Sequence, residues 1–244
     1  MKDGATNIDV VCVKWGTEYS DEYVHILKEM VQRNTNVPFR FKAFTDGPIT
    51  GIDCVPLPTG LNGWWNKLYL FAKHHTYDGT LNDRVVYFDL DTVITGNIDF
   101  FLEYDRDFCG IENLGVNNKY EQPDAYRNVF QSGVLAWKRD WAHFIYDIFY
   151  DRQEEITKNI RGDGELLHEI FQQLRIPVDL FQHQWPGKLK SYKYQIYETG
   201  LDEETAIICF HGEPRPHQAI NQITYPWGVE FKPNPWIVEY WRRT

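Results

Sequence analysis

Two aspartates that follow an apolar run are the strongest chemical signal in the sequence. The run reads VVYFDLDT, with Asp89 and Asp91 at its end. Because side chains alternate along a strand, we expect both carboxylates to face the same way and Leu90 to point back into the core. Adjacent carboxylates repel each other unless a cation joins them, which favours a divalent metal site. A solvated pair of turn aspartates that merely caps the strand is the alternative without chemistry.

A histidine follows a second apolar run near the C terminus. The run reads IICFHGEPRPH, which gives His211 and, four residues later, Arg215. A neutral imidazole beside two carboxylates suits Mn²⁺ better than Mg²⁺, which prefers oxygen ligands only. A guanidinium group binds phosphate oxygens through two parallel hydrogen bonds. We therefore expect Asp89, Asp91 and His211 to hold Mn²⁺ (or Mg²⁺) next to a phosphate-bearing ligand.

The string FDLDTV also fits haloacid-dehalogenase-type phosphatases, in which the first aspartate, here Asp89, would be the nucleophile. Those enzymes normally carry the motif on the first strand of the catalytic domain, whereas a β-α-β pattern precedes it here. No later Asp-Asp or Gly-Asp-x-x-x-Asp completes a metal site of that kind. The phosphatase stays an alternative, as does a catalytically silent module that binds a sugar nucleotide or a glycan.

Six ordered motifs resemble those of GT-A-fold glycosyltransferases of family 8, the glycogenin-like enzymes, and of uncharacterised bacterial glycosyltransferase-like proteins. They are WWNKLYLF (64–71), VVYFDLDTVITGNI (85–98), FQSGVLAW (130–137), RGDGELL (161–167), PGKLKSYK (186–193) and CFHGEPRPH (209–217). The resemblance implies a metal-dependent transferase that moves a sugar from a nucleotide-sugar donor to an acceptor. It also implies a UDP-sugar and retention of the anomeric configuration, while the acceptor stays unidentified.

The same resemblance assigns roles in donor binding. Lys67 would contact the donor phosphate and sugar, and Arg215 the diphosphate. The nucleotide and the rest of the donor would be bound by residues at strand ends and in the two metal motifs: Val13, Lys14, Trp15, Thr45, Asp46, Asp89, Leu90, Asp91 and Gly212.

Three further residues are expected at the reacting sugar. Asp163 would stabilise positive charge at the anomeric carbon, by analogy with the carboxylates of glycosidases. Its segment departs from the family pattern, since residues 162–165 read Gly-Asp-Gly-Glu and Glu165 replaces an aspartate. Gln131 stands where many relatives have asparagine and could reach a sugar hydroxyl. We therefore name Asp163, Glu165 and Gln131 as the candidate catalytic residues.

Strands and helices alternate along the chain and position these residues. Apolar patterns predict strands at 8–15, 39–45, 52–57, 84–88, 108–111, 134–137 and 206–210, and helices after Ser20 and at 64–74, 141–152 and 164–174, with an irregular stretch at 181–197. Such alternation predicts one α/β domain, a GT-A-like (Rossmann-like) fold whose mainly parallel mixed central sheet is flanked by helices. Residues from about 1 to 95 would form a nucleotide-binding half, and residues from about 96 to 244 an acceptor-side half. Ligands in such sheets bind beyond the carboxyl ends of the strands, where Asp89 lies.

Charge and cysteine content indicate which classes of ligand and which cellular compartment to expect. The net charge of −10 over 244 residues argues against nucleic acid, whose binding draws on lysine and arginine. Four scattered cysteines without a C-x-x-C pair are typical of free thiols in a reducing compartment, so we expect a cytoplasmic protein. No segment approaches the roughly 20 apolar residues that span a bilayer, so we expect no integral membrane segment. The tryptophans near the C terminus are expected to pack rather than to bind sugar: Trp185, Trp227, Trp236 and Trp241.

Overall fold

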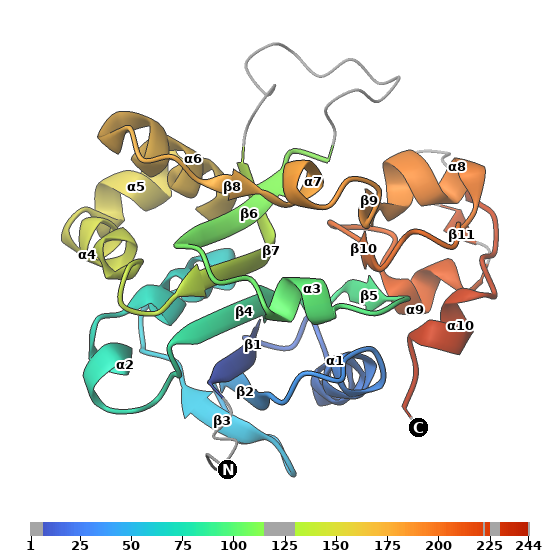
Figure 1. Cartoon of the computed structure of the whole chain (residues 1–244), viewed down its shortest axis with the longest axis horizontal. Helices are drawn as coiled ribbons and strands as arrows, with labels where there is room; N and C mark the ends of the chain where they lie inside the picture. Colours follow the sequence, from blue (N-terminus) through green and yellow to red (C-terminus); the bar gives the residue numbers. More distant parts are fainter. Residues whose placement is uncertain (1–6, 115–129, 222, 225–229, 244) are drawn as a thin grey trace.

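The computed structural model describes residues 7–114, 130–221, 223–224 and 230–243, and Trp227 lies outside them (Figure 1). The elements of the first half are β1 (Ile8–Lys14), α1 (Asp21–Arg33), β2 (Arg40–Thr45), β3 (Asp53–Pro56), the 3₁₀ helix η1 (Gly63–Phe71), α2 (His74–Tyr77), β4 (Arg84–Phe88), β5 (Thr92–Ile94), α3 (Asp99–Leu102) and β6 (Phe108–Glu112). Those of the second half are β7 (Phe130–Lys138), α4 (His143–Asp151), α5 (Gln153–Asn159), α6 (Asp163–Leu174), β8 (Asp179–Leu180), α7 (Phe181–Gln184), β9 (Leu189–Ser191), the π helix η3 (Tyr192–Ile196), α8 (Tyr197–Thr199), β10 (Ile207–Cys209), α9 (Pro216–Ala219), β11 (Ile223–Thr224), β12 (Glu230–Phe231) and α10 (Ile237–Tyr240).

A seven-stranded sheet forms the centre of the domain, in the order β3-β2-β1-β4-β7-β6-β8. The pairs β3-β2, β2-β1, β1-β4 and β6-β8 are parallel, whereas β7 runs antiparallel to both β4 and β6. A smaller sheet, β5-β10-β9, lies beside it. The predicted single α/β domain with a mainly parallel mixed sheet is therefore confirmed.

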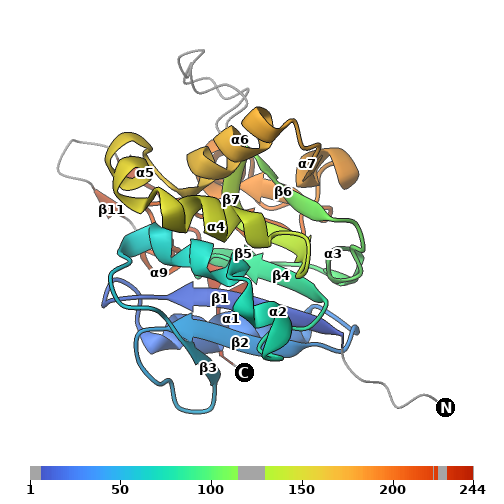
Figure 2. The ribbon, with the colours of Figure 1, turned by 90° about the vertical axis from the view of Figure 1, so that its left-hand side faces the viewer.

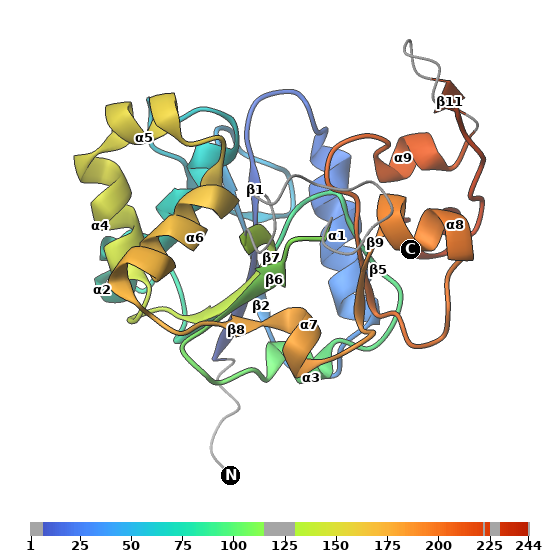
Figure 3. The same ribbon diagram turned by 90° about the horizontal axis from the view of Figure 1, so that it is seen from above.

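Helices cover both faces of the central sheet, which Figure 3 shows nearly edge-on. Alternate residues of β4 belong to opposite layers: Val86 and Phe88 pack on the side of α1, and Val85 and Tyr87 on the side of η1, α4 and α6. Figure 2 looks onto the second of these layers, with α4, α5 and α6 in front. A strand buried on both faces reads as a continuous apolar run, which is why 84–88 was recognisable in the sequence.

The element that carries Lys67 differs from its prediction. The expected α-helix at 64–74 is the 3₁₀ helix η1, which ends at Phe71 and is followed by the separate short helix α2. Trp65, Leu68 and Phe71 recur every three residues and are buried. This spacing stacks the three apolar side chains on one face of a helix with three residues per turn.

The stretch 181–197 was predicted to be irregular, but the structure shows short regular elements there. It contains α7, β9, η3 and α8, of which β9 pairs in parallel with β10, with Leu189 opposite Ile207. Elements this short are stabilised by their partners in space rather than by a local pattern, so periodicity does not reveal them.

The remaining expectations concern thiols, tryptophans and membranes. Cys12, Cys54, Cys109 and Cys209 are all free thiols. Trp185, Trp236 and Trp241 pack against the core layer that contains α1. Among the helices that the structure describes, none has both the length and the apolar character that a bilayer span requires.

Candidate active site

A cavity of about 650 Å³ opens beyond the carboxyl ends of β1 and β4. Its volume lies within the range of roughly 300–1,000 Å³ that small-molecule sites occupy. Its position is that of ligand sites in open α/β sheets. The predicted residues that line it are Val13, Trp15, Lys67, Asp89, Leu90, Asp91, Gln131, Asp163, Glu165, His211, Gly212 and Arg215.

Three residues predicted for the nucleotide pocket lie outside this lining: Lys14, Thr45 and Asp46. The ammonium group of Lys14 pairs with Asp21 at 3.2 Å. The backbone N–H of Gly16 donates a hydrogen bond of 2.9 Å to Asp46, which ties the loop after β1 to the loop after β2. Their part in donor binding stays a prediction.

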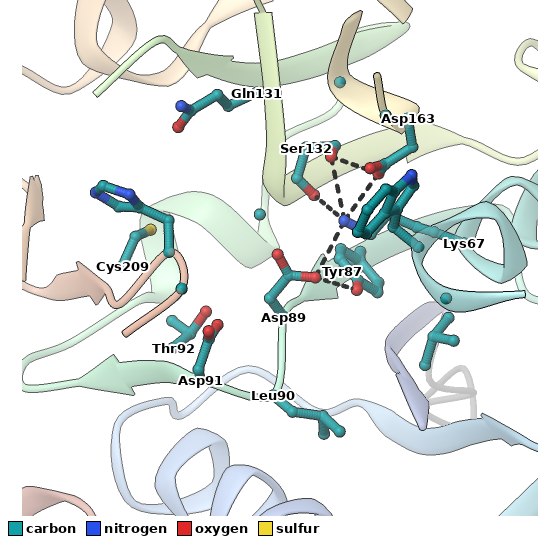
Figure 4. Close-up of a pocket in the computed structure, with 18 of the residues that line it drawn as sticks. Lys67, Tyr87, Asp89, Leu90, Asp91, Thr92, Gln131, Ser132, Asp163 and Cys209 are labelled. Carbon is teal, nitrogen blue, oxygen red and sulfur yellow. Dashed lines mark hydrogen bonds and ion pairs between the residues drawn. The ribbon is translucent and has the colours of Figure 1, made fainter. Parts of the chain in front are cut away.

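A buried lysine joins the two sides of the cavity (Figure 4). The Nζ of Lys67 lies 2.9 Å from Oδ2 of Asp163 and 3.1 Å from Oδ1 of Asp89. Ser132 accepts two further hydrogen bonds from this Nζ, at its carbonyl oxygen (3.2 Å) and its Oγ (3.1 Å). Burial alone would lower the pKa of Lys67, but the two carboxylates outweigh it and hold the pKa above its usual value. The ammonium therefore stays charged and links the end of β4 to the start of α6.

Two hydroxyl groups complete this cluster, and sequence reasoning missed both as functional groups. Ser132 Oγ donates to Oδ2 of Asp163 at 2.5 Å, and the hydroxyl of Tyr87 donates to Oδ1 of Asp89. The ring of Tyr87 lies under the Lys67 ammonium, 5.0 Å from its centroid. Tyr87 and Asp89 are two residues apart, so strand alternation would have placed them on one face.

The strand predicted at 84–88 is confirmed as β4, and the two aspartates of the Asp-x-Asp motif lie in the turn between β4 and β5, so the strand alternation used to orient them does not extend through the motif. The N–H of Thr92 donates to the carbonyl of Asp89 at 3.0 Å, which closes the turn. Both carboxylates nevertheless face the cavity, and the side chain of Leu90 points away from them (Figure 4). Leu90 is 4% exposed and packs in the core, as expected.

Asp91 is a buried carboxylate that forms no direct ion pair with a lysine or arginine among the described residues. It is 7% exposed, and its Oδ2 accepts a hydrogen bond of 3.0 Å from the hydroxyl of Tyr19. Burial, together with the nearby charge of Asp89, raises the pKa of Asp91 to about 7. Burial also raises the pKa of Asp89, although Lys67 opposes this effect. A cation placed between the two carboxylates would offset both the burial of their charges and the repulsion between them.

His211 contributes a neutral imidazole to the same cavity. Burial, and then the charge of Lys193, lowers the pKa of His211 to about 3. Its Nε2 lies 2.7 Å from the Oγ of Ser191. The ligand atoms of Asp89, Asp91 and His211 share the cavity but do not form a group within 4.8 Å of one another.

The ammonium of Lys193 lies near this end of the cavity. A Cβ added to Gly212 would be 3.6 Å from its Nζ, and burial lowers the pKa of Lys193. The side chain belongs to the PGKLKSYK motif, whose spacing alone gave no reason to select it over its neighbours. The sequence indicated this basic segment as one that could close over the donor or meet the acceptor, and the structure selects Lys193 within it as a candidate anion-binding residue.

Arg215 lies at the rim of the cavity, bound to the loop after β1. Its guanidinium stacks over the ring of Tyr19, 4.3 Å from the centroid. It donates to the carbonyl oxygen of Glu18 at 3.1 Å and also pairs with the Glu18 carboxylate. A donor phosphate that binds Arg215 would therefore have to exchange with this carboxylate.

The other two predicted catalytic residues are held by neighbours. Both oxygens of Glu165 bind the guanidinium of Arg161 at 3.0 Å, and this pairing lowers the pKa of Glu165. The Nε2 of Gln131 donates to Oδ1 of Asn113 at 3.1 Å. Both side chains line the cavity, but only Asp163 belongs to the Lys67 cluster.

Gly164 fixes the approach of α6 to β7, and its substitution gives a stability prediction. A Cβ at Gly164 would lie 2.8 Å from the carbonyl oxygen of Phe130 and 3.3 Å from Cα of Gln131. Because backbone must shift to admit it, we expect Gly164→Ala to lower the free energy of unfolding by about 1–3 kcal/mol in urea denaturation. A Cβ at Gly47 meets nothing within 4 Å, so Gly47→Ala is the matched control, with an expected change within about 0.5 kcal/mol. Equal effects in the two variants would contradict the close approach.

Comparisons with known proteins bear on the fold. No protein-family model matches the chain, and no curated protein matches it significantly. The chain is similar to the solved structure of the galactosyltransferase LgtC in complex with donor and acceptor sugar analogues, with a TM-score of 0.60 and 14% identity, covering 85% of this chain and 88% of that one. It is similar to an active-site mutant of LgtC to the same degree, covering 85% of this chain and 89% of that one. At this identity the similarity establishes the fold, which is GT-A-like.

Proposed function

We propose that this chain is a metal-dependent glycosyltransferase that transfers a sugar from a nucleotide-sugar donor to an acceptor. The donor is a UDP-sugar, and transfer retains the anomeric configuration. The observation that carries the proposal is the Lys67 ammonium bridging Asp89 and Asp163 in a cavity at the carboxyl ends of β1 and β4. The fold shared with a galactosyltransferase supports it.

Asp89, Asp91 and His211 would hold Mn²⁺ (or Mg²⁺). The donor set fits such an ion, since Asp91 forms no direct ion pair among the described residues and His211 is neutral. If Nε2 of His211 donates to Ser191, the lone pair of Nδ1 is free for the ion. When bound, the ion would supply Lewis-acid stabilisation of the departing diphosphate.

The residues around this group would stabilise the two charges that develop as the bond to the anomeric carbon breaks. Lys193 and Arg215 lie where positive charge would meet phosphate oxygens at the end of the cavity near His211. Asp163 would face the developing positive charge of the sugar, with its carboxylate oriented by Lys67 and Ser132. Fixed charges of this kind need no reorganisation during the reaction, which is the basis of electrostatic catalysis.

The base and ribose are assigned to the part of the cavity at the carboxyl end of β1. Val13, near the end of β1, and Trp15, just after this strand, line this part of the cavity, and Trp15 is 39% exposed. A flat, accessible ring at this point provides a surface for an aromatic base. Asp46, fixed by the N–H of Gly16, lies on the adjoining loop.

The phosphatase alternative is not favoured. Three strands, β1 to β3, precede β4, so the motif does not lie on the first strand. Oδ1 of Asp89, the would-be nucleophile, is also engaged by both Lys67 and Tyr87.

Release of nucleotide from donors tests the proposal. Many transferases slowly hydrolyse their donor without an acceptor, so we expect Mn²⁺-dependent release of UDP from at least one member of a panel of UDP- and GDP-sugars. Chelation with EDTA should abolish the release. Absence of nucleotide release from every donor would favour the silent binding module instead, and release unaffected by EDTA would contradict metal dependence.

A further inference from the structure

A second cluster of metal-ligating side chains lies outside the cavity, on α2. His74, His75 and Asp78 each offer one ligand atom, and these atoms lie within 4.8 Å of one another, the one such group among the residues that the structure describes. Helical spacing of three and four residues brings Asp78 to the face of both imidazoles. α2 stands at the side of the domain in Figure 1, faces the viewer in Figure 2, and contributes no residue to the cavity.

His75 has a buried nitrogen without a partner. The residue is 1% exposed, and its Nε2 lies 3.1 Å from the carbonyl oxygen of Tyr69. A carbonyl only accepts, so Nε2 carries the proton and Nδ1 keeps its lone pair. No hydrogen bond reaches Nδ1. A buried acceptor without a hydrogen-bond partner lowers the stability of the fold, and a metal ion is one partner that would satisfy it.

The other nitrogen of His75 already has the partner that metal-binding histidines typically have. In such residues the second ring N–H donates to a backbone carbonyl or a carboxylate, which fixes the ring and its tautomer. The carbonyl of Tyr69 provides this contact for His75, and the Tyr69 hydroxyl lies 2.9 Å from Nε2 of His74. Both imidazoles are therefore oriented by one residue of η1.

The charges in the cluster suit a cation. Burial, and then the neighbouring His74, lowers the pKa of His75 to about 4, so the ring is neutral at physiological pH. Asp78 is exposed, and its Oδ1 accepts a hydrogen bond of 2.8 Å from the N–H of Thr80. Burial opposes ionisation of Asp78, but the contacts to Thr80 outweigh it and lower its pKa, so the carboxylate is ionised.

We propose that His74, His75 and Asp78 bind one divalent transition-metal ion of the zinc class, with solvent in the remaining position. Two imidazole nitrogens and one carboxylate oxygen are the ligands that tetrahedral Zn²⁺ accepts. Tyr69 belongs to η1 and contacts both imidazoles, so an ion bound to them would hold the end of η1 in place. Lys67, the bridging cation of the cavity, lies two residues earlier on the same helix.

Titration of the full chain with Co²⁺ tests this site without any donor or acceptor. The parent for the experiment carries Asp91→Asn, which weakens metal binding in the cavity. We expect one equivalent of Co²⁺ to bind with the visible absorption of tetrahedral cobalt. His74→Gln and Asp78→Asn should each weaken binding by about tenfold or more, because even the loss of an outer-shell partner costs about 10- to 100-fold.

The controls separate this cluster from general histidine binding. His143 pairs with Asp147 on α4 at 3.3 Å, and no third ligand joins them among the residues that the structure describes, so His143→Gln should leave the affinity unchanged. His74 and Asp78 are exposed, and a far-ultraviolet spectrum equal to that of the parent will show that their variants fold. Absence of Co²⁺ binding in the parent, or an unchanged affinity in either ligand variant, would overturn the site.

Discussion

Replacing Asp91 with alanine should lower kcat/KM for Mn²⁺-dependent nucleotide release by about 10²- to 10³-fold. This corresponds to about 3–4 kcal/mol of lost charge stabilisation at the leaving phosphate. The effect is expected to be large because Asp91 forms no direct ion pair among the described residues and its pKa is raised by burial and by Asp89, so a metal would gain a carboxylate that no side-chain cation neutralises directly. The measurement is the initial rate of UDP release across a range of Mn²⁺ concentrations.

A surface aspartate provides the matched control. Asp140 is exposed and pairs only locally with Arg139 at 2.8 Å, so Asp140→Asn should retain the activity of the unmodified chain. If Asp91→Ala kept an undiminished rate and an unchanged Mn²⁺ requirement, the carboxylate would have no part in binding the metal.

Replacing Lys67 with methionine should lower the free energy of unfolding by about 3–5 kcal/mol, which is typical when one partner of a buried ion pair is removed. Methionine keeps much of the length of the side chain but leaves Asp89 and Asp163 facing each other without a cation. Lys67 is 8% exposed and Asp163 10% exposed at the side chain, so water compensates little for the loss of this pair, whereas Asp89 is 36% exposed and accounts for the smaller part of the effect. Urea denaturation measures the loss, and an unchanged m-value will show that the transition stays two-state.

Two further variants test whether the loss of the Lys67 charge causes the predicted loss of stability. Lys138 pairs with Asp107 at 3.2 Å at the surface, with 47% and 57% of the two side chains exposed. Lys138→Met should therefore cost at most about 1 kcal/mol. Adding Asp163→Asn to Lys67→Met removes one of the stranded charges and should restore part of the stability. A loss for Lys67→Met no larger than for Lys138→Met would contradict the role of the buried ammonium.

The sequence was sufficient to predict the fold class and the position of the acidic pair. The apolar run that ends in Asp89 is buried on both faces of the sheet, and that environment leaves a clear pattern. The site residues at strand ends, such as Val13 and His211, follow from the same logic because strand ends meet at one edge of the sheet. The predictions were therefore best where a residue's place depends on one regular strand.

Contacts between distant segments were not predictable in this way. Tyr19 reaches Asp91 from a loop 72 residues earlier, and no periodic pattern indicates that contact. Ser132 was not among the residues selected from the sequence, yet it lies on β7, which begins at Phe130, and its Oγ accepts a hydrogen bond from Lys67. The pairing of Glu18 with Arg215 likewise joins segments 197 residues apart. Which polar side chains meet in the cavity depends on tertiary packing that a single sequence does not display.

Binding of the metal by two neighbouring carboxylates and a distant imidazole is the central claim. A crystal structure of the chain with Mn²⁺ and UDP, with manganese located by its anomalous scattering, tests it most directly. We predict one manganese peak in the cavity, within coordination distance of Asp89, Asp91 and His211 and of the diphosphate. Manganese bound away from these residues, or UDP bound in the cavity with His211 still directed at Ser191 and no metal present, would contradict it.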